Sequence, residues 1–153
     1  MDVERDLELL LDERACERLV HEYAWAVDSG EASAIADLFT EDGVWEAADG
    51  RRFEGRDEIR RAFTGRQGLR RRTSMHVCTN VLVRREGPDD ASGTSYLLNY
   101  RHDTADDGVP VLPVPAAPPK FVGIYHDRYV RTAAGWKMSY RRFELRFLRP
   151  RSR

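Results

Sequence analysis

Residues 73–86, TSMHVCTNVLVRRE, mark the point where the spacing of apolar residues changes from helical to extended. Upstream of this stretch apolar side chains recur every three or four positions, whereas from here on they tend to alternate with polar ones. Three later stretches have the β-branched and aromatic composition of strands, namely 95–104, 120–131 and 136–148. The connections GPDD at 87–90 and AAG at 133–135 are short and rich in turn residues, so they predict antiparallel neighbouring strands.

The N-terminal part of the chain has the pattern of helices. Apolar residues within 7–27 form one helical stripe, made of Leu9, Leu10, Cys16, Leu19, Val20, Tyr23, Ala24 and Val27. Gly30 follows the stripe, and a glycine in the left-handed conformation commonly ends a helix. A second short helix is expected over 33–39 and a third after Gly55, with a short strand at 44–47 between them.

This order of elements predicts one α+β domain over 1–153, a half-open cone in which three N-terminal helices pack on one face of a curved antiparallel sheet. A chain of 153 residues with 41% hydrophobic content is long enough for one such core and too short for a second domain. The concave face of the sheet and the first helix would enclose a pocket, where we expect the chemistry. The loop 105–119 holds five of the seven prolines, and its 109–119 part is predicted to be a lid or a strap between subunits.

Charge and motifs argue against several classes of function. A net charge of -1 and a pI near 6.4 argue against a dedicated nucleic-acid-binding protein, although 60–72 holds six arginines and no acid. Apolar runs are too short to span a bilayer and no signal-peptide pattern begins the chain, so we expect a cytoplasmic protein without a membrane partner. Neither the two cysteines nor the histidines have metal-site spacing, so no metal is predicted. Phosphate-loop, dinucleotide, serine-hydrolase and zincin motifs are absent from the sequence.

Two titratable residues are unusual for their positions. Asp28 is predicted in the last turn of the first helix, where the helix dipole disfavours a carboxylate, so it is either an exposed turn residue or a buried carboxylate facing the pocket. Alternation along 73–83 places His76 opposite a face that is apolar enough to be core. That predicted core face carries Val77, Thr79, Val81 and Val83. His76 would then point to the pocket or to solvent, and beside an orienting carboxylate it could act as a general base.

Aromatic side chains recur on the same elements. Tyr23 lies on the stripe of the first helix and either packs in the core or points its phenol into the pocket as a hydrogen-bond donor. Alternation places Tyr100 and His102 on one face of the strand 95–104, and Tyr125 lies in the strand that follows. Such stripes are often ordinary core, but an aromatic pocket would suit a planar or polycyclic substrate.

Six short motifs in this order resemble the SnoaL-like branch of the nuclear-transport-factor-two-like superfamily. They are Tyr23-Ala24-x-Ala26-x-Asp28, Leu38-Phe39-Thr40-Glu41-Asp42-Gly43-Val44, Phe53-Glu54-Gly55-Arg56-Asp57-Glu58-Ile59, His76-Val77-x-x-Asn80, Gly123-x-Tyr125-x-Asp127-x-Tyr129-Val130-Arg131 and Gly135-Trp136-Lys137-Met138-x-x-Arg141. The resemblance covers nearly the whole chain and implies the cone fold. It implies less about the reaction, because this fold hosts dehydratases, isomerases, cyclases, dehydrochlorinases and non-catalytic subunits.

Within that superfamily the chain looks most like the cofactor-free lyases scytalone dehydratase, bile-acid dehydratase and hexachlorocyclohexane dehydrochlorinase. Asp28 and His76 match the aspartate–histidine dyad of the last two. Tyr23 matches the helix tyrosine of the two dehydratases, whereas the dehydrochlorinase has a lysine there. The resemblance therefore implies Asp28, His76 and Tyr23 as catalytic residues and no cofactor.

The predicted substrate contacts are Trp45, Asn99, Tyr100, His102, Tyr125 and Arg141. By resemblance, Arg141 matches a strand arginine that can face the pocket. Asn99 falls where the bile-acid enzyme has a further aspartate, although Tyr100 or His102 could take that place.

The sequence thus leads to the hypothesis of a cofactor-independent acid–base lyase or isomerase, dehydratase-like, acting on a small hydrophobic carbonyl compound of polycyclic or polyketide type. Asp28 itself is the alternative base. Two hypotheses from other functional classes remain open. The protein would be either a non-catalytic small subunit resembling that of ring-hydroxylating dioxygenases or a nucleic-acid-associated domain that binds through the arginines of 60–72. The resemblance also implies a homo-oligomer, with a trimer expected before a dimer.

Overall fold

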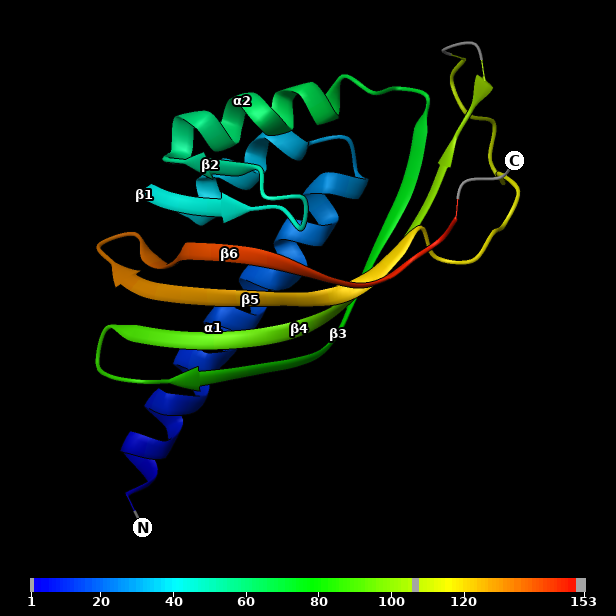
Figure 1. Ribbon diagram of the computed structural model, residues 1–153. Helices are drawn as coiled ribbons and strands as arrows, with labels where there is room; N and C mark the ends of the chain where they lie inside the picture. Colours follow the sequence, from blue (N-terminus) through cyan, green and yellow to red (C-terminus); the bar gives the residue numbers. More distant parts are fainter. Residues whose placement is uncertain (1, 106–107, 151–153) are drawn as a thin grey trace.

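A curved six-stranded sheet with three helical segments on one side makes up the structure, a computed structural model that describes residues 2–105 and 108–150 (Figure 1). The elements are α1 (Val3–Asp28), η1 (Ala32–Leu38), β1 (Phe39–Glu46), β2 (Arg52–Glu54), α2 (Arg56–Gln67), β3 (Arg72–Arg85), β4 (Asp90–Asp103), β5 (Phe121–Thr132) and β6 (Gly135–Leu148). This is the predicted α+β cone with three N-terminal helices. The largest differences in a boundary are at β1, which begins at Phe39 rather than at 44, and at β4, which begins at Asp90 rather than at 95.

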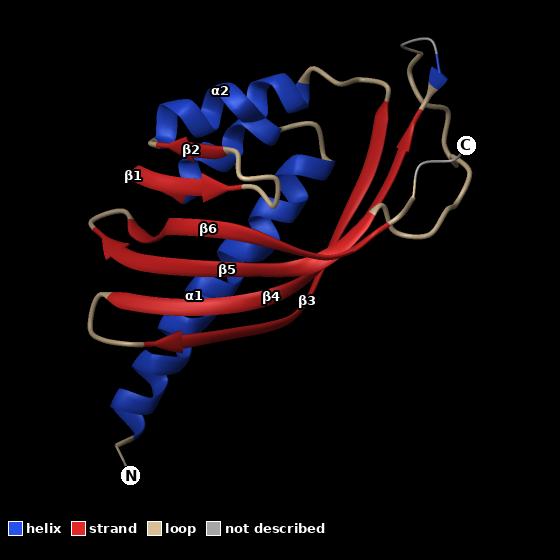
Figure 2. Ribbon diagram, in the orientation of Figure 1, coloured by secondary structure: helices blue, strands red, loops and turns tan. Residues whose placement is uncertain are grey.

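The strands lie in the order β2-β1-β6-β5-β4-β3 (Figure 2). From β3 to β6 they form an antiparallel meander, as the short connections predict. The sheet is mixed rather than purely antiparallel, because β1 runs parallel to β6, with Val44 opposite Tyr140. The two parallel strands are far apart in sequence, so no hairpin constrains their relative direction. The three-residue β2 pairs antiparallel with β1 at the edge and has no counterpart among the predicted strands.

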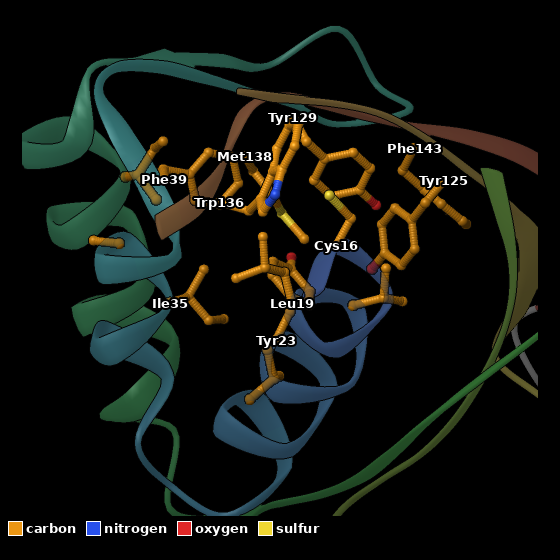
Figure 3. Close-up of a cluster of buried hydrophobic side chains, with 14 of the residues drawn as sticks. Cys16, Leu19, Tyr23, Ile35, Phe39, Tyr125, Tyr129, Trp136, Met138 and Phe143 are labelled. Carbon is orange, nitrogen blue, oxygen red and sulfur yellow. The ribbon is translucent and has the colours of Figure 1, made fainter. Parts of the chain in front are cut away.

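Helix α1 lies across the sheet, and its apolar stripe forms one side of the core (Figure 3). Cys16 and Leu19 belong to the same buried cluster as Tyr129 and Met138 from the sheet. The first turns of α1 project beyond the strands (Figure 1). Leu10, which belongs to the predicted stripe, is 61% exposed, because it points away from the face of α1 that carries the buried Cys16 and Leu19.

A buried carboxylate interrupts this stripe. Asp12 accepts hydrogen bonds from Arg131 Nη2 at 2.6 Å and from Trp136 Nε1 at 2.9 Å, and Arg85 Nη1 lies 3.2 Å from its Oδ2. These partners come from β5, β6 and β3, respectively. One carboxylate thus connects the N-terminal half of α1 to three strands. The ion pairs and hydrogen bonds compensate for the hydration that this buried charge loses.

Strand β3 corrects the predicted assignment of its faces. Of the predicted core face Val77, Thr79, Val81 and Val83, only the last two contact the core. Val77 is 40% exposed, whereas His76 and Cys78 lie on the side of the helices. The register of β3 against β4 shifts around Asn80, whose φ is +51°. A bulge of this kind adds one residue to the strand, so the alternation before it and after it differs in phase.

The predicted loop 105–119 connects β4 to β5 at the same end of the molecule as the C-terminus (Figure 1). Its residues 106 and 107 lie outside the described residues. Arg149 Nη1 donates a hydrogen bond to the Pro118 carbonyl oxygen at 2.6 Å, and this bond fastens the loop to the end of the chain. Val111 and Leu112 are exposed. A role as a lid or strap stays a prediction.

The close approach of β5 and β6 depends on a glycine. The register of the two strands shifts between Val122 and Gly123, and a bulge of this kind bends a strand. A Cβ atom at Gly123 would overlap the carbonyl oxygen of Glu144 and lie 2.6 Å from the Phe143 ring. Only a residue without a side chain lets the backbones approach so closely at this bend.

We expect Gly123→Ala to lower the free energy of unfolding by about 1–3 kcal/mol, because the added methyl group forces the two strands apart. Urea denaturation followed by circular dichroism measures this change. Gly65→Ala is the matched control, since Gly65 lies in α2 with nothing within 4 Å of a built Cβ. It should leave the protein as stable or more stable by up to about 1 kcal/mol. Equal losses in both variants would contradict the role assigned to Gly123.

Candidate active site

A cavity of about 670 Å³ lies between the sheet, the C-terminal half of α1, and α2. Its volume falls in the range of roughly 300–1,000 Å³ that small-molecule sites occupy. Its walls are largely aromatic, with Tyr23, Trp45, Phe53, Phe63, Phe121, Tyr125 and Phe143. The polar side chains that reach it include Arg66, Arg72, Ser74, His76, Asn99 and Arg101. Of the predicted site residues, the structure therefore places Tyr23, Trp45, His76, Asn99 and Tyr125 in the wall of one cavity.

Asp28, the last residue of α1, holds His76 of β3 in place. Its Oδ2 accepts a hydrogen bond from the His76 backbone N–H at 2.6 Å, and its Oδ1 accepts another from Ser74 Oγ at 2.9 Å. His76 Nδ1 lies 2.7 Å from the same Oδ1. These contacts offset the unfavourable helix dipole at this position. Of the two interpretations that the sequence leaves open for Asp28, the geometry matches the largely buried carboxylate.

The contacts of His76 select one tautomer of its ring. A carboxylate can only accept hydrogen bonds, so Nδ1 carries the proton that is shared with Asp28. Nε2 is then an acceptor. Asn99 Nδ2 lies 3.2 Å from Nε2 and 3.5 Å from Nδ1, so the amide lies over the face of the ring and not along the Nε2 lone pair. The Nε2 lone pair is the basic site of this arrangement. Asn99 Oδ1 is buried and has no hydrogen-bond partner among the described residues.

Tyr23 presents a neutral phenol to the cavity. Burial raises its pKa to about 12, although the Arg141 cation and hydrogen bonds with Trp45 and Tyr125 act in the opposite direction. The Tyr23 hydroxyl oxygen accepts a hydrogen bond from Trp45 Nε1 at 2.9 Å. Because that bond uses a lone pair and not the hydroxyl proton, Tyr23 keeps its proton to donate.

Arg141 does not line the cavity, contrary to the prediction that it contacts substrate. Its side chain is fully buried, and its Nε and Nη2 each donate to the Asp127 carboxylate at 2.8 Å. The guanidinium lies over the rings of Tyr23 and Tyr125, 4.3 Å and 4.0 Å from their centroids. Burial alone would lower the pKa of Arg141, but Asp127 raises it above its ordinary value. A permanent positive charge thus lies beside both phenols of the wall.

The predicted substrate contacts Tyr100 and His102 are also corrected. Successive side chains of a strand point to opposite faces, and in β4 it is Asn99 and Arg101 that line the cavity. Tyr100, which is 42% exposed, and His102 therefore lie on the outer face of the sheet. Asn99 is the residue of this strand that meets His76.

Sequence reasoning missed several cavity residues. Ser74 lies two positions before His76 on the same face of β3, so the strand period could have indicated it. Arg66 appears in the sequence only as part of an arginine-rich helix end, and nothing local shows that it turns inward to donate to Ser74 Oγ at 2.7 Å. Phe53 lies in β2, which is too short to have a recognisable strand pattern.

A second hollow, of about 940 Å³, lies on the sheet away from Asp28 and His76. Its wall includes His126, whose Nε2 lies 2.6 Å from Glu144 Oε2. Both of these side chains are about one-third exposed, whereas the Asp28–His76 pair is more deeply buried. Burial strengthens electrostatic contacts and permits control of proton transfer, so the first cavity is the candidate active site.

Residues 2–105 and 108–150 contain neither a metal-binding cluster nor a membrane-spanning helix. No three His, Cys, Asp or Glu side chains within these ranges gather closely enough to hold a metal ion. No helix in the same ranges is both long and apolar enough to cross a membrane.

A family model described as SnoaL-like domain matches residues 8–142. The chain belongs to the SnoaL-like family. This finding confirms the resemblance that the six motifs indicate, and it covers every element from α1 to most of β6. No protein with a curated description shows significant sequence similarity to this SnoaL-like chain.

Solved structures similar to this SnoaL-like protein share its fold. A hexachlorocyclohexane dehydrochlorinase, LinA type 3, from Novosphingobium barchaimii is 17% identical with a TM-score of 0.76, over 96% of this chain and 94% of that one. A candidate scytalone dehydratase from Novosphingobium aromaticivorans is 23% identical with a TM-score of 0.75, over 90% and 86%. A candidate aromatic ring hydroxylase from the same species is 26% identical with a TM-score of 0.72, over 90% and 91%. These proteins have different stated activities. The shared cone therefore does not identify the reaction, which has to be inferred from the cavity.

We expect Asp28→Asn to remove the preference of His76 for the Nδ1-protonated tautomer, because an amide has no full negative charge to attract that proton. Nitrogen-15 NMR of the histidine rings distinguishes the two tautomers. Glu144→Gln is the matched control, since it should change the signals of His126 and leave those of His76 as they are. A His76 spectrum that is identical in wild type and Asp28→Asn would contradict the pairing.

Proposed function

We propose that this protein is a cofactor-independent acid–base lyase or isomerase of dehydratase type, with His76 as the base. The observation that carries the proposal is His76, which lies in the wall of an aromatic cavity with its Nδ1 2.7 Å from Asp28 Oδ1. A base at the edge of a water-poor cavity contributes about 10²–10⁴ in rate when it is held within reach of the proton it removes. Membership in the SnoaL-like family supports this class of reaction.

In the proposed reaction His76 Nε2 takes a proton from a carbon next to a carbonyl group. The electron pair of the broken C–H bond forms the new double bond. The C–O bond on the neighbouring carbon breaks, and its hydroxyl group leaves as water after it accepts a proton. Asp28 stabilises the imidazolium that forms, and Tyr23 donates its proton to the developing oxyanion or to the leaving hydroxyl. Arg141 supports Tyr23, since a cation beside the ring favours negative charge on the phenol oxygen.

The wall of the cavity favours an unsaturated ring system as substrate. Trp45 stacks on Phe53 with centroids 5.6 Å apart, and Phe63 meets Trp45 edge-on. Such surfaces bind planar, apolar molecules. We therefore propose a small hydrophobic carbonyl compound of polycyclic or polyketide type as the substrate class.

Asp28 is less suited to be the base than His76. Both of its oxygens already accept hydrogen bonds, Oδ1 from Ser74 and Oδ2 from the backbone of His76. These hydrogen bonds occupy lone pairs that the carboxylate would need in order to accept a proton from a substrate. His76 keeps its Nε2 lone pair to accept a proton, because its Nδ1 carries the proton that is shared with Asp28.

A second candidate function is a non-catalytic small subunit of a ring-hydroxylating enzyme. The likeness to a candidate aromatic ring hydroxylase favours it. In such a subunit the cavity would bind a ligand without chemistry, so loss of His76 would have no effect on a proton-transfer assay.

We expect the protein to accelerate hydrogen–deuterium exchange on the carbon next to the carbonyl of 1-tetralone, a bicyclic aromatic ketone. Proton NMR in deuterated water follows this step without the need for a leaving group. His76→Ala and Asp28→Asn should each reduce the enzymatic rate by about 10²–10⁴, and Tyr23→Phe should reduce it as well.

The control for this assay is His21→Ala, because His21 is an exposed histidine of α1 away from the cavity. It should exchange as fast as wild type. An exchange rate equal to that of buffer in the wild-type protein, or one unaffected by His76→Ala, would reject the lyase proposal and favour the subunit.

We also propose that the protein is a homo-oligomer, and we expect a trimer before a dimer. The outer face of the sheet exposes apolar side chains on neighbouring strands, with Met75 opposite Tyr100 and Tyr96 opposite Ile124. Phe147, which is 70% exposed, extends this surface onto β6. Exposed apolar surface of this extent is typical of sites that bind a partner.

We expect light scattering after size exclusion to give three times the 17.6 kDa of one chain. Tyr96→Glu should reduce the mass to that of one chain, because it places a charge within the apolar surface. Trp25→Glu is the matched control, since Trp25 is 74% exposed but lies on α1 and not on the sheet. A wild-type protein with the mass of a single chain would contradict the proposal.

A further inference from the structure

One end of the cavity is formed by three arginines from three different elements. Arg66 comes from the last turn of α2, Arg72 begins β3, and Arg101 lies near the end of β4. The antiparallel register brings the two strands together here, with Ser74 opposite Arg101 and Arg72 opposite Asp103. All three arginines line the same cavity as His76.

Two of these arginines share one carboxylate. Arg72 donates to both oxygens of Asp103 at 2.7 and 3.0 Å, and Arg101 donates to Oδ2 at 2.9 and 3.2 Å. The hydrogen bonds with Arg72 are the main reason that the pKa of Asp103 lies well below its usual range. Asp103 is therefore ionised, and its single negative charge is divided between two cations.

Arg66 has no carboxylate partner among the described residues. The one hydrogen bond of its guanidinium is from Nη2 to the neutral hydroxyl of Ser74, at 2.7 Å. Its side chain is partly buried, and burial followed by the Arg72 cation lowers the pKa of Arg66. An arginine stays charged nonetheless, so Arg66 brings to the cavity a positive charge that Asp28 and Asp103 offset only at a distance, since no carboxylate of residues 2–105 and 108–150 forms an ion pair with it.

Among the residues that the structure describes, the balance of charge at this end is positive. With His76 neutral, the cations of Arg66, Arg72 and Arg101 face the carboxylates of Asp28 and Asp103. Taking an uncompensated charge out of water is costly, and a ligand of opposite charge reduces that cost. Arginine is also the side chain best suited to bind a carboxylate with two parallel hydrogen bonds.

We propose that the arginine end of the cavity, led by Arg66, binds a carboxylate on the substrate, so that the substrate is a hydrophobic ring carbonyl compound with a separate acid group. This proposal rests on the proposed lyase function, because the bound acid is a substrate only if the protein catalyses a reaction. The ring would lie between the aromatic walls while the acid group pairs with Arg66.

The same contacts predict how the acid group orients the substrate. Arg66 and Asp28 both form a hydrogen bond with Ser74 Oγ. A carboxylate bound to Arg66 would therefore be separated by a single side chain, that of Ser74, from Asp28, which holds His76. The acid would thus fix the position of the ring relative to the base. The carbonyl that activates the C–H bond is a different group, because removing a proton next to a carboxylate would create two adjacent negative charges.

The test is equilibrium binding of 2-naphthoate and of 2-naphthamide, two ligands of the same shape that differ in charge. Isothermal titration calorimetry measures both affinities. Because a hydrogen bond to a charged group is stronger than one to a neutral group, we expect wild type to bind the acid about tenfold or more tightly than the amide. The ratio should fall as ionic strength rises, since salt screens the arginines.

Variants assign this preference to Arg66. Arg66→Gln should reduce the ratio of the two affinities to about one, and Arg66→Lys should retain part of it because the charge is kept. Arg61→Gln is the matched control: it removes the same charge from an exposed position of the same helix and should leave the ratio unchanged. Thermal unfolding of each variant checks that it is folded, and the salt dependence of wild type tests the charge even where a variant does not fold.

Equal affinity for acid and amide in wild type, failure of the acid to bind at millimolar concentration, or a preference that survives Arg66→Gln would each overturn the inference. The binding assay involves no turnover, so its result is distinct from that of the exchange assay. Acid preference without His76-dependent exchange would mean an anion-binding cavity in a protein that is not a lyase. His76-dependent exchange without acid preference would mean a lyase for neutral substrates.

Discussion

Two carboxylates hold α1 against the sheet, Asp12 in its N-terminal half and Asp28 at its last residue, and the positions of the core and the cavity depend on this attachment. Asp12 is bound by side chains of three strands, and Asp28 by the backbone and side chain of β3. Between them the apolar stripe of α1 packs on the strands. Buried polar contacts of this kind add less to stability than their number implies, but they fix one geometry, because a charge left without its partners is costly.

The attachment at Asp28 also sets the chemistry of the site. The same hydrogen bonds that keep the helix end on β3 orient His76 and define which ring nitrogen is free. The contact that holds the helix end and the contact that orients the proposed base therefore involve the same carboxylate. For this reason the tautomer of His76 and the stability of the fold need to be measured separately in any variant of Asp28.

The cavity has two chemically different ends. Aromatic rings from β1, β2, α2, β5 and β6 form the apolar part, and arginines from α2, β3 and β4 form the charged part. The Asp28–His76 pair lies close to the charged part through Ser74. The similar solved structures share the cone and have different stated activities, so a substrate has to be inferred from the residues of the cavity and not from the fold.

Local pattern was sufficient for the elements of this protein and for part of its site. Helical spacing predicted α1 with Asp28 at its end, and two-residue spacing predicted the four long strands, because each of these signals repeats within a single segment. Asp28, His76 and Tyr23 could be grouped through the family resemblance, and the structure brings the first two into contact. Their catalytic role remains a proposal.

Tertiary structure alone decided which way many side chains point. The bulge at Asn80 reverses the faces of β3, and Asp127 draws Arg141 away from the cavity into a buried ion pair. Arg66, in contrast, turns inward from a helix end that looks solvated in sequence. What the sequence by itself determined is the order and type of the elements, since these follow from neighbours in the chain. The faces, the buried ion pairs and the charged end of the cavity follow from contacts between distant segments, which no local spacing records.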